Sequence, residues 1–263
     1  MGIRKALVIG INYVSSPSAR LRGCHNDALR ARDYLIEKRG YAKADVKVAL
    51  DRTGEGQGTT KGGIVEAILR LANATYREEV EEVYIHYSGH GAQMEDAPEG
   101  FERRIEEGGM DEALVPSDFR THGLIRDDHI NSLLQEFHPR TRVRCVFDCC
   151  HSGTMADLPW KLSVGDAGFR EVRSGTATPG KNVVCISGCR DDQVSMDAHD
   201  VNGRGKFSGA MTSCMMKVIE GRGGEMTLRT LFTDLHDTLR THGFRQKPVL
   251  TASSAVDLDT RVF

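Results

Sequence analysis

The chain has 263 residues, of which 39% are hydrophobic and 27% charged, as is typical of a globular protein with one large domain or two small ones. Its formal net charge of −2 argues against a basic surface for nucleic acid or anionic lipid. No apolar run approaches the ~20 residues of a membrane span, and the first residues do not form a secretion signal. We therefore expect an intracellular, cytoplasmic protein that binds neither nucleic acid nor a membrane.

Short apolar runs alternate with helical patterns along most of the chain. Strands are expected over residues 6–12, 45–50, 82–88, 111–116, 143–150, 182–188 and 247–253. Helices are expected over residues 26–41, 61–74 and 126–137 and within the segments 205–220 and 226–243. Residues 161–181, rich in Gly, Ser and Thr, are expected to form an exposed linker. This alternation predicts an α/β protein whose mostly parallel central sheet is covered by helices on both faces.

Two segments follow predicted strands at the end where such folds place their functional sites. They are YSGHG (87–91), after the third strand, and DCCHSG (148–153), at the end of the strand over residues 143–150. In open α/β sheets, ligands bind beyond the carboxyl ends of the strands. We therefore expect the functional residues to lie in these two segments.

The seven cysteines of the chain favour a reducing compartment. Their number is odd, and several lie within apolar runs, which does not suit a disulfide framework. Cys149, Cys150 and His151 are consecutive, whereas structural zinc sites separate their paired ligands by about two to four residues. A zinc site is therefore not expected at this segment.

Alternation along the strand distinguishes the two adjacent cysteines. One face carries Val143, Cys145, Phe147 and Cys149, and the other carries Arg144, Val146, Asp148 and Cys150. Cys149 completes an apolar row and is expected to pack in the core as a small hydrophobic residue. Cys150 lies where the apolar pattern gives way to a glycine-containing loop, so it is better placed to meet a substrate.

Four histidines compete as the base for Cys150. His151 is adjacent in sequence, and neighbouring side chains in an extended chain diverge. His86 lies within a strand and is expected to be a satisfied core histidine, whereas His25 enters a helix without flanking glycines. His90 follows a strand end between two glycines, which allow a substrate backbone to approach. From the residues alone, a catalytic Cys150–His90 pair and a chance neighbourhood of two loops both remain open.

The segment YSGHGAQ, followed about sixty residues later by VFDCCHSGT, resembles the metacaspases, which are caspase-like cysteine peptidases of plants, fungi, protists and bacteria. Further segments match the family in order: LRGCHNDA (21–28), MDEALVPSDF (110–119), IRDDHINSLL (125–134), ISGCRDDQVSMDA (186–198) and GFRQKPVLTAS (243–253). The short connection between the DCCHSG and ISGCRDDQ segments resembles type I members. The resemblance implies one caspase-like domain over residues 1–263, with a large-subunit-like part (1–160), a linker (161–181) and a small-subunit-like part (182–263).

The resemblance assigns the catalytic dyad to His90 and Cys150. It implies that the thiol attacks a peptide carbonyl and that His90 carries the proton to the leaving amine. The backbone N–H groups of Gly91 and Cys150 would hold the oxyanion. Water then hydrolyses the acyl-enzyme.

Metacaspases cleave after Arg or Lys, and the residues that match their specificity pocket are Cys24, Asp27, Ser88 and Asp148. Carboxylates are the best partners for a guanidinium, which agrees with the two aspartates. Without the resemblance, Asp27 would be interpreted as the N-cap of a helix. The expected substrates are proteins or peptides with Arg or Lys before the scissile bond.

Calcium activates many metacaspases, and the carboxylates that match its ligands are Asp111, Asp127, Asp128 and Asp157. Four hard oxygen donors of this kind are suited to Ca²⁺. The alternative for Asp127 and Asp128 is a purely structural one, because acidic residues are favourable at the positive start of a helix.

The resemblance further implies a monomer and links the chain to autoprocessing, with basic residues of the linker as cleavage sites, and to programmed cell death. A rival hypothesis is a catalytically silent caspase-like protein that binds and regulates partners, although such a protein has no chemical reason to keep both the dyad and the pocket. A redox role for Cys149 and Cys150 is disfavoured because adjacent cysteines close only a strained ring.

Overall fold

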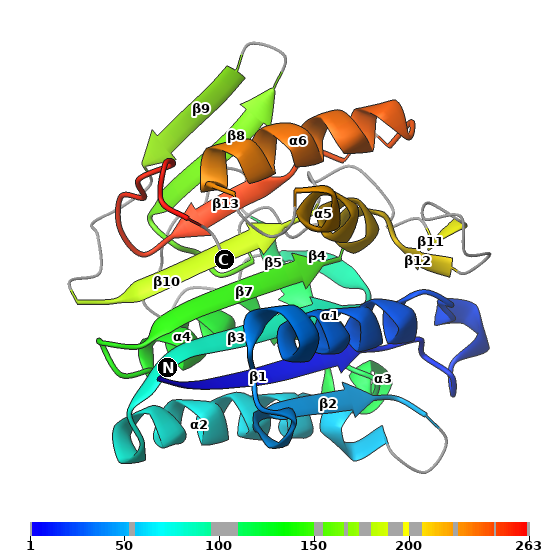
Figure 1. Cartoon of the computed structure of the whole chain (residues 1–263). Coiled ribbons are helices and arrows are strands. Elements are labelled where there is room, and N and C mark those ends of the chain that lie inside the picture. Colours follow the sequence, from blue (N-terminus) through cyan, green and yellow to red (C-terminus); the bar gives the residue numbers. More distant parts are fainter. Residues whose placement is uncertain are drawn as a thin grey trace.

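The computed structural model of the chain describes residues 2–52, 56–95, 110–149, 155–165, 168–173, 180–188, 197–199, 207–222, 226–244 and 246–261. Its centre is an eight-stranded sheet with the strand order β2-β1-β3-β7-β10-β13-β8-β9 (Figure 1). In that order the strands are Val46–Leu50, Ile3–Gly10, Val80–Ser88, Arg142–Asp148, Asn182–Ser187, Val249–Ala252, Trp160–Gly165 and Gly168–Arg173. The first five strands are parallel, and the last three are antiparallel to their neighbours.

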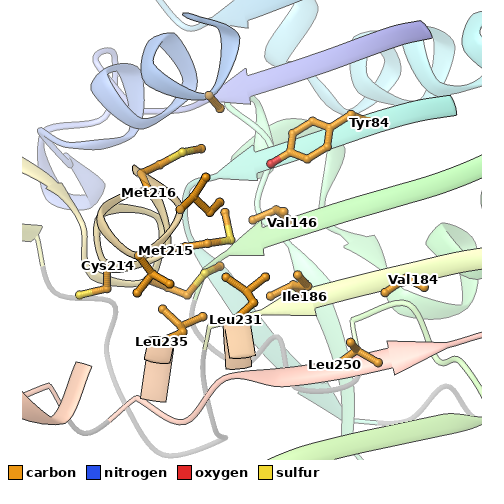
Figure 2. Close-up of a cluster of buried hydrophobic side chains, with 14 of the residues drawn as sticks. Tyr84, Val146, Val184, Ile186, Cys214, Met215, Met216, Leu231, Leu235 and Leu250 are labelled. Atoms are coloured by element: carbon orange, nitrogen blue, oxygen red, sulfur yellow. The ribbon is translucent and has the colours of Figure 1, made fainter. Parts of the chain in front are cut away.

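Helices cover both faces of this sheet. On one face lie α1 (Cys24–Arg39), α5 (Ala210–Gly221) and α6 (Leu228–Thr241), and on the other lie α2 (Lys61–Arg77) and α4 (Asp127–Gln135) (Figure 1). Figure 2 shows the first of the two cores, where side chains of α5 and α6 meet those of β7, β10 and β13. The expected α/β arrangement of three layers is thus confirmed.

Smaller elements complete the chain. A three-stranded antiparallel sheet contains β4 (Gly91–Glu95), β5 (Met110–Leu114) and β6 (Ile125–Arg126), and β11 (Asp197–His199) pairs with β12 (Phe207–Gly209). The short helix α3 spans Phe119–His122, and 3-10 turns η1, η2 and η3 span Pro17–Ala19, Lys43–Asp45 and Gly56–Thr59. The strand expected over residues 111–116 therefore exists as β5, but it belongs to the small sheet.

The prediction of a linker over residues 161–181 is wrong for the first part of this segment. That part forms the hairpin of β8 and β9 at the edge of the sheet. Most side chains of β9 are exposed, so this edge strand carries few of the apolar residues that mark a strand in sequence. Residues 174–179 lie outside the described residues, and the division into two subunit-like parts stays a prediction.

Strand alternation at β7 agrees with the prediction made from sequence. Cys149 is only 1% exposed and packs with Cys145 and Phe147 in the core beneath α2 and α4. Val146 lies in the opposite core, on the face of Asp148. Within the described residues, no helix has both the length and the apolar character needed to cross a membrane.

Candidate active site

The carboxyl ends of β3 and β7 lie side by side, as expected from the two sequence segments. Ser88 pairs in register with Asp148, and the Gly89 backbone N–H donates to the Asp148 carbonyl oxygen at 3.4 Å. His90 follows directly, and Gly91 begins β4 opposite Leu114. Cys150 and His151 lie outside the described residues, so the proposed nucleophile has no described position.

The side chain of His90 is held by a backbone carbonyl. Its ring Nε2 lies 2.8 Å from the carbonyl oxygen of Ala19 in the turn η1. A carbonyl oxygen only accepts hydrogen bonds, so Nε2 carries the hydrogen. In the neutral ring, Nδ1 then has the lone pair and is the atom able to take a proton.

Two buried tyrosines fix the backbone around His90. Its N–H donates to the phenol oxygen of Tyr13 at 2.8 Å, and the Tyr87 hydroxyl lies 2.9 Å from its carbonyl oxygen. Tyr13 also donates to the Val115 carbonyl at 2.7 Å, and its ring centroid lies 4.7 Å from that of His90. Burial raises the pKa of Tyr13 and Tyr87, which therefore remain neutral. Both phenols are thus structural supports for the histidine.

His25, the weaker candidate for the base, has a different partner. Its Nε2 lies 2.6 Å from Asp51 Oδ1, and the same carboxylate accepts the backbone N–H groups of Asn12 at 2.7 Å and Val14 at 2.9 Å. These bonds hold the turn on either side of Tyr13, whose φ of 52° lies in the left-handed region. His25 therefore supports the loop beneath His90.

His86, which was expected to be a satisfied core histidine, is fully buried on β3, but its ring is not hydrogen-bonded to any described residue. Neither ring nitrogen has a hydrogen-bond partner among the residues that the structure describes. Burial lowers the pKa of His86 to about 4, so the ring is neutral at physiological pH. The expectation of a hydrogen-bonded core histidine is therefore wrong.

Three of the four predicted pocket residues lie together near His90. They are Asp27 on α1, Ser88 on β3 and Asp148 on β7. Asp27 and Asp148 are 1% and 2% exposed. Asp27 Oδ2 accepts a hydrogen bond from the Ser88 hydroxyl at 3.0 Å and from the Gly209 N–H at 2.7 Å. Cys24 is buried one turn earlier on α1, and its N–H donates to the Asn12 side chain at 3.0 Å.

Asp148 is anchored through one oxygen only. Its Oδ2 accepts the backbone N–H of Thr212 at 2.8 Å, whereas Oδ1 has no hydrogen-bond partner within the described part of the chain. Burial raises the pKa of Asp148, and the Thr212 N–H opposes this effect. A buried carboxylate oxygen without a donor is costly, so this position favours a cationic or hydrogen-bond-donating group.

The start of α5 brings the two carboxylates close together. A Cβ at Gly209 would overlap Asp148 Oδ2 and would stand 3.1 Å from Asp27 Oδ2. The N–H groups of Gly209 and Thr212, at the first turn of α5, point at Asp27 and Asp148, so the carboxylates also satisfy the positive end of this helix. Asp27 therefore does not cap its own helix, α1. Its carboxylate instead accepts a hydrogen bond from a backbone N–H at the start of α5.

The four predicted calcium ligands lie around the start of α4. Asp127 is 1% exposed, and its two oxygens accept the N–H groups of Glu112 and Asp128, each at 2.8 Å. Burial raises the pKa of Asp127 to about 7; these two hydrogen bonds oppose the shift, and the charges of Asp111 and Asp128 add to it. Asp127 thus holds the start of α4 against β5, and its burial disfavours the ionised carboxylate.

The remaining ligands have other contacts. Asp111 forms an ion pair with Arg126, and the backbone carbonyl of Asp157 accepts the Asn131 side-chain amide at 2.9 Å. Throughout the described ranges, no group of three or more His, Cys, Asp or Glu side chains is arranged to hold a metal ion. The predicted ligands are thus neighbours, but this conformation does not bring them into one coordination shell.

A family model described as metacaspase, peptidase C14 domain, matches residues 4–159. Metacaspase-2 of Trypanosoma brucei brucei is 33% identical over 270 residues, which cover 97% of this chain and 74% of that protein. Metacaspase-1A of Neurospora crassa is 30% identical over 305 residues, which cover 98% of this chain and 64% of that protein.

The chain belongs to the metacaspases. It is therefore a caspase-like cysteine peptidase, and its substrates are proteins or peptides. Solved structures agree in fold. A protein of Geobacter sulfurreducens matches with a TM-score of 0.68 at 22% identity, over 98% of this chain and 97% of that one. Caspase-1 from Spodoptera frugiperda matches with a TM-score of 0.55 at 13% identity, over 96% and 87% of the two chains.

Several residues that shape this metacaspase site were not predicted from sequence. They are Tyr13, Ala19, Gly209 and Thr212. Three of the four act through the backbone, which any residue type offers, so no local motif identifies them. Tyr13 follows the first predicted strand, but nothing in that segment indicates a contact with a residue 77 positions away.

Proposed function

We propose that this metacaspase is an endopeptidase that cleaves after Arg or Lys, that Cys150 and His90 form its dyad, and that calcium stimulates it. One observation carries the specificity: Asp27 on α1 and Asp148 at the end of β7 are buried beside each other, next to the end of β3 that precedes His90. Two carboxylates withdrawn from water attract a basic side chain and repel an acidic one.

The free oxygen of Asp148 is the natural partner for the substrate cation. Within the described residues its Oδ1 has no donor, and it lies 3.5 Å from where a Cβ of Gly188 would stand. A guanidinium or ammonium at this point would give a charge-assisted hydrogen bond and would stabilise the ionised carboxylate. A side chain at Gly188 or Gly209 would crowd this carboxylate, so the two glycines allow the backbone to pack closely against it.

The proposed reaction uses His90 Nδ1 as the proton carrier. It takes the proton of the Cys150 thiol, and the thiolate sulfur attacks the carbonyl carbon of the substrate. The C–N bond breaks as Nδ1 returns the proton to the leaving amine, and water then hydrolyses the thioester. Because Ala19 fixes the ring through Nε2, the tautomer suits this task before substrate binds. The N–H groups of Gly91 and Cys150 are the proposed oxyanion donors.

Calcium would be held by Asp111, Asp127, Asp128 and Asp157. The set fits in chemistry, since it consists of hard oxygen donors; burial raises the pKa of Asp127, and the charges of Asp111 and Asp128 add to this shift. It does not fit in geometry as described, because Arg126 already neutralises Asp111 and backbone N–H groups hold Asp127. Bound calcium would supply positive charge at this cluster, and Arg126 must release Asp111 for the ion to reach it.

Fluorogenic peptides that end in Arg, Lys or Asp, assayed with calcium or with chelator, test this proposal. We expect wild type to turn over the Arg and Lys peptides with calcium, Cys150→Ala to be inactive and Cys149→Ala to remain active. Asp148→Asn should lower kcat/KM for the Arg peptide about tenfold or more, because a charge-assisted hydrogen bond is lost. An inactive wild type under all conditions favours the silent regulator, and equal loss in both cysteine variants contradicts the assignment of the nucleophile.

A further inference from the structure

A second site lies at the other end of β7. A cavity of about 330 Å³ opens between the first residues of β7 and β10 and the C-terminal segment 254–261. Arg144 lines it and stands on the same face of β7 as Asp148, four residues earlier, which is about 13 Å along a strand. The cavity is thus separate from the candidate active site.

Arg144 has no carboxylate partner among the residues described. Its guanidinium donates only to the Val143 carbonyl at 3.2 Å and to the backbone and side-chain oxygens of Asn182 at 3.4 and 3.1 Å. Burial lowers the pKa of Arg144; nearby Glu82 opposes this shift, and Arg142 adds to it. A half-buried cation without a counter-ion is unfavourable, so the cavity favours an anion.

Lys181 contributes to the wall of the cavity, but alternation along the chain places its side chain on the face of Val183, opposite to that of Arg144. Lys181 Nζ donates to the carbonyl oxygens of Gln135 at 2.5 Å and Phe137 at 2.7 Å, and it forms no ion pair within the described ranges. Arg144 is therefore the cation that faces the cavity on this side of the sheet.

The other charged groups that line the cavity form no ion pair with Arg144 within the described residues. Arg142 pairs with Glu81 at 2.7 Å and Glu82 at 3.4 Å, so its charge is balanced. Asp257 is the acidic residue that lines the cavity, and its carboxylate accepts the Asp259 N–H at 2.9 Å.

The floor of the cavity is apolar except for one hydroxyl. In Figure 2, Tyr84, Val146, Val184 and Ile186 project from neighbouring strands on one face of the sheet. Tyr84 stands beside Arg144 in the strand register, and its hydroxyl makes no hydrogen bond to any described residue. Burial raises the pKa of Tyr84, so the hydroxyl stays protonated and able to donate.

We propose that this cavity binds a small anion with an apolar body, whose carboxylate or phosphate group is held by Arg144 and whose hydrocarbon part lies over Tyr84 and Val184. Its volume lies at the lower end of the range for small-molecule sites, roughly ten waters. Convergent donors over an apolar floor are the usual composition of such sites.

Thermal unfolding and calorimetric titration of the full chain test this site, with phenyl phosphate, phenylacetate and inorganic phosphate as probes at constant ionic strength. We expect a saturable rise in Tm with at least one aromatic probe and a smaller rise with inorganic phosphate. The tighter of the two aromatic probes identifies the anionic group. Arg144→Met should weaken binding at least tenfold, whereas Arg140→Met, an exposed residue outside the cavity lining, should leave binding unchanged.

The same variants separate a ligand site from a structural role. Because Arg144 forms no ion pair with a described residue, Arg144→Met without probe should keep or raise Tm. Tyr84→Phe removes only the hydroxyl and should weaken binding severalfold in a protein that still folds. The proposal is overturned by the absence of any saturable shift, by equal affinity in wild type and Arg144→Met, or by full affinity in Tyr84→Phe together with a lowered Tm in Arg144→Met.

Discussion

The backbone N–H of His90 donates a 2.8 Å hydrogen bond to the phenol oxygen of Tyr13, and the two rings lie 4.7 Å apart. Together with the Ala19 carbonyl at Nε2, this contact leaves the imidazole little freedom to turn. In the proposed dyad, His90 exchanges protons with a thiol, and such fixation favours this role because catalysis depends on the orientation of the base.

Tyr13→Phe tests this support. The substitution removes the acceptor for the His90 N–H but keeps the ring contact, and a half-buried N–H without a partner costs about 1–3 kcal/mol. We expect kcat for an Arg peptide to fall roughly tenfold, with KM little changed, because the pocket for the substrate side chain remains intact. Tyr76→Phe, at a 60% exposed tyrosine, is the matched control. Unchanged kcat in Tyr13→Phe contradicts the positioning role.

Gly209→Ala tests the approach of α5 to the two carboxylates. The added Cβ overlaps Asp148 Oδ2 and crowds Asp27, so both side chains must move. We expect kcat/KM for Arg and Lys peptides to fall at least tenfold, since misplaced charges bind the substrate cation poorly. Gly221→Ala, at the other end of α5, is the control, because no atom lies within 4 Å of the point where its Cβ would stand. Equal activity of the two variants argues against a pocket at this point.

The core elements could be predicted from sequence because they carry buried, periodic apolar residues. Val143, Cys145 and Phe147 alternate along β7, and this pattern alone placed Cys149 in the core. The hairpin of β8 and β9 escaped prediction because an exposed edge strand needs few apolar residues. The periodic spacing of apolar residues reflects burial. It therefore does not reveal exposed elements at the edge of a fold.

The site was predicted by a different route. Asp27, Ser88 and Asp148 were grouped through the family resemblance, since no pattern in the chain links residues on three separate elements. The role of Gly209 could not be predicted from the sequence, because it depends on where α5 begins relative to two carboxylates in the folded chain. The lack of hydrogen bonds at the His86 ring could also be found only from the structure. The sequence shows that a strand is buried, but it does not show which polar atoms meet around it.

His86 makes stability depend on pH. Its pKa is lowered to about 4 in the folded protein and is about 6.5 when unfolded, so the unfolded chain binds more protons between these values. Stability should therefore fall as pH decreases from 6.5 to 4, by about 3 kcal/mol from this group. His86→Leu should flatten the urea-unfolding free energy over this range, whereas His129→Gln, at an exposed histidine on α4, should not. An unchanged slope in His86→Leu refutes the assignment.

Arg126→Gln tests whether an internal cation occupies the proposed calcium site. The guanidinium neutralises Asp111, so calcium must replace this ion pair when it binds. Without the competing charge, calcium should bind Arg126→Gln severalfold more tightly, as measured by calorimetry on protein that also carries Cys150→Ala to prevent self-digestion. The calcium-free variant should unfold at a lower temperature, because Asp111 then faces Asp127 without a counter-ion. Arg120→Gln, whose side chain contacts the exposed Ser18, should bind calcium as the parent does. Weaker calcium binding in Arg126→Gln would mean that this arginine organises the ligands rather than competing for them.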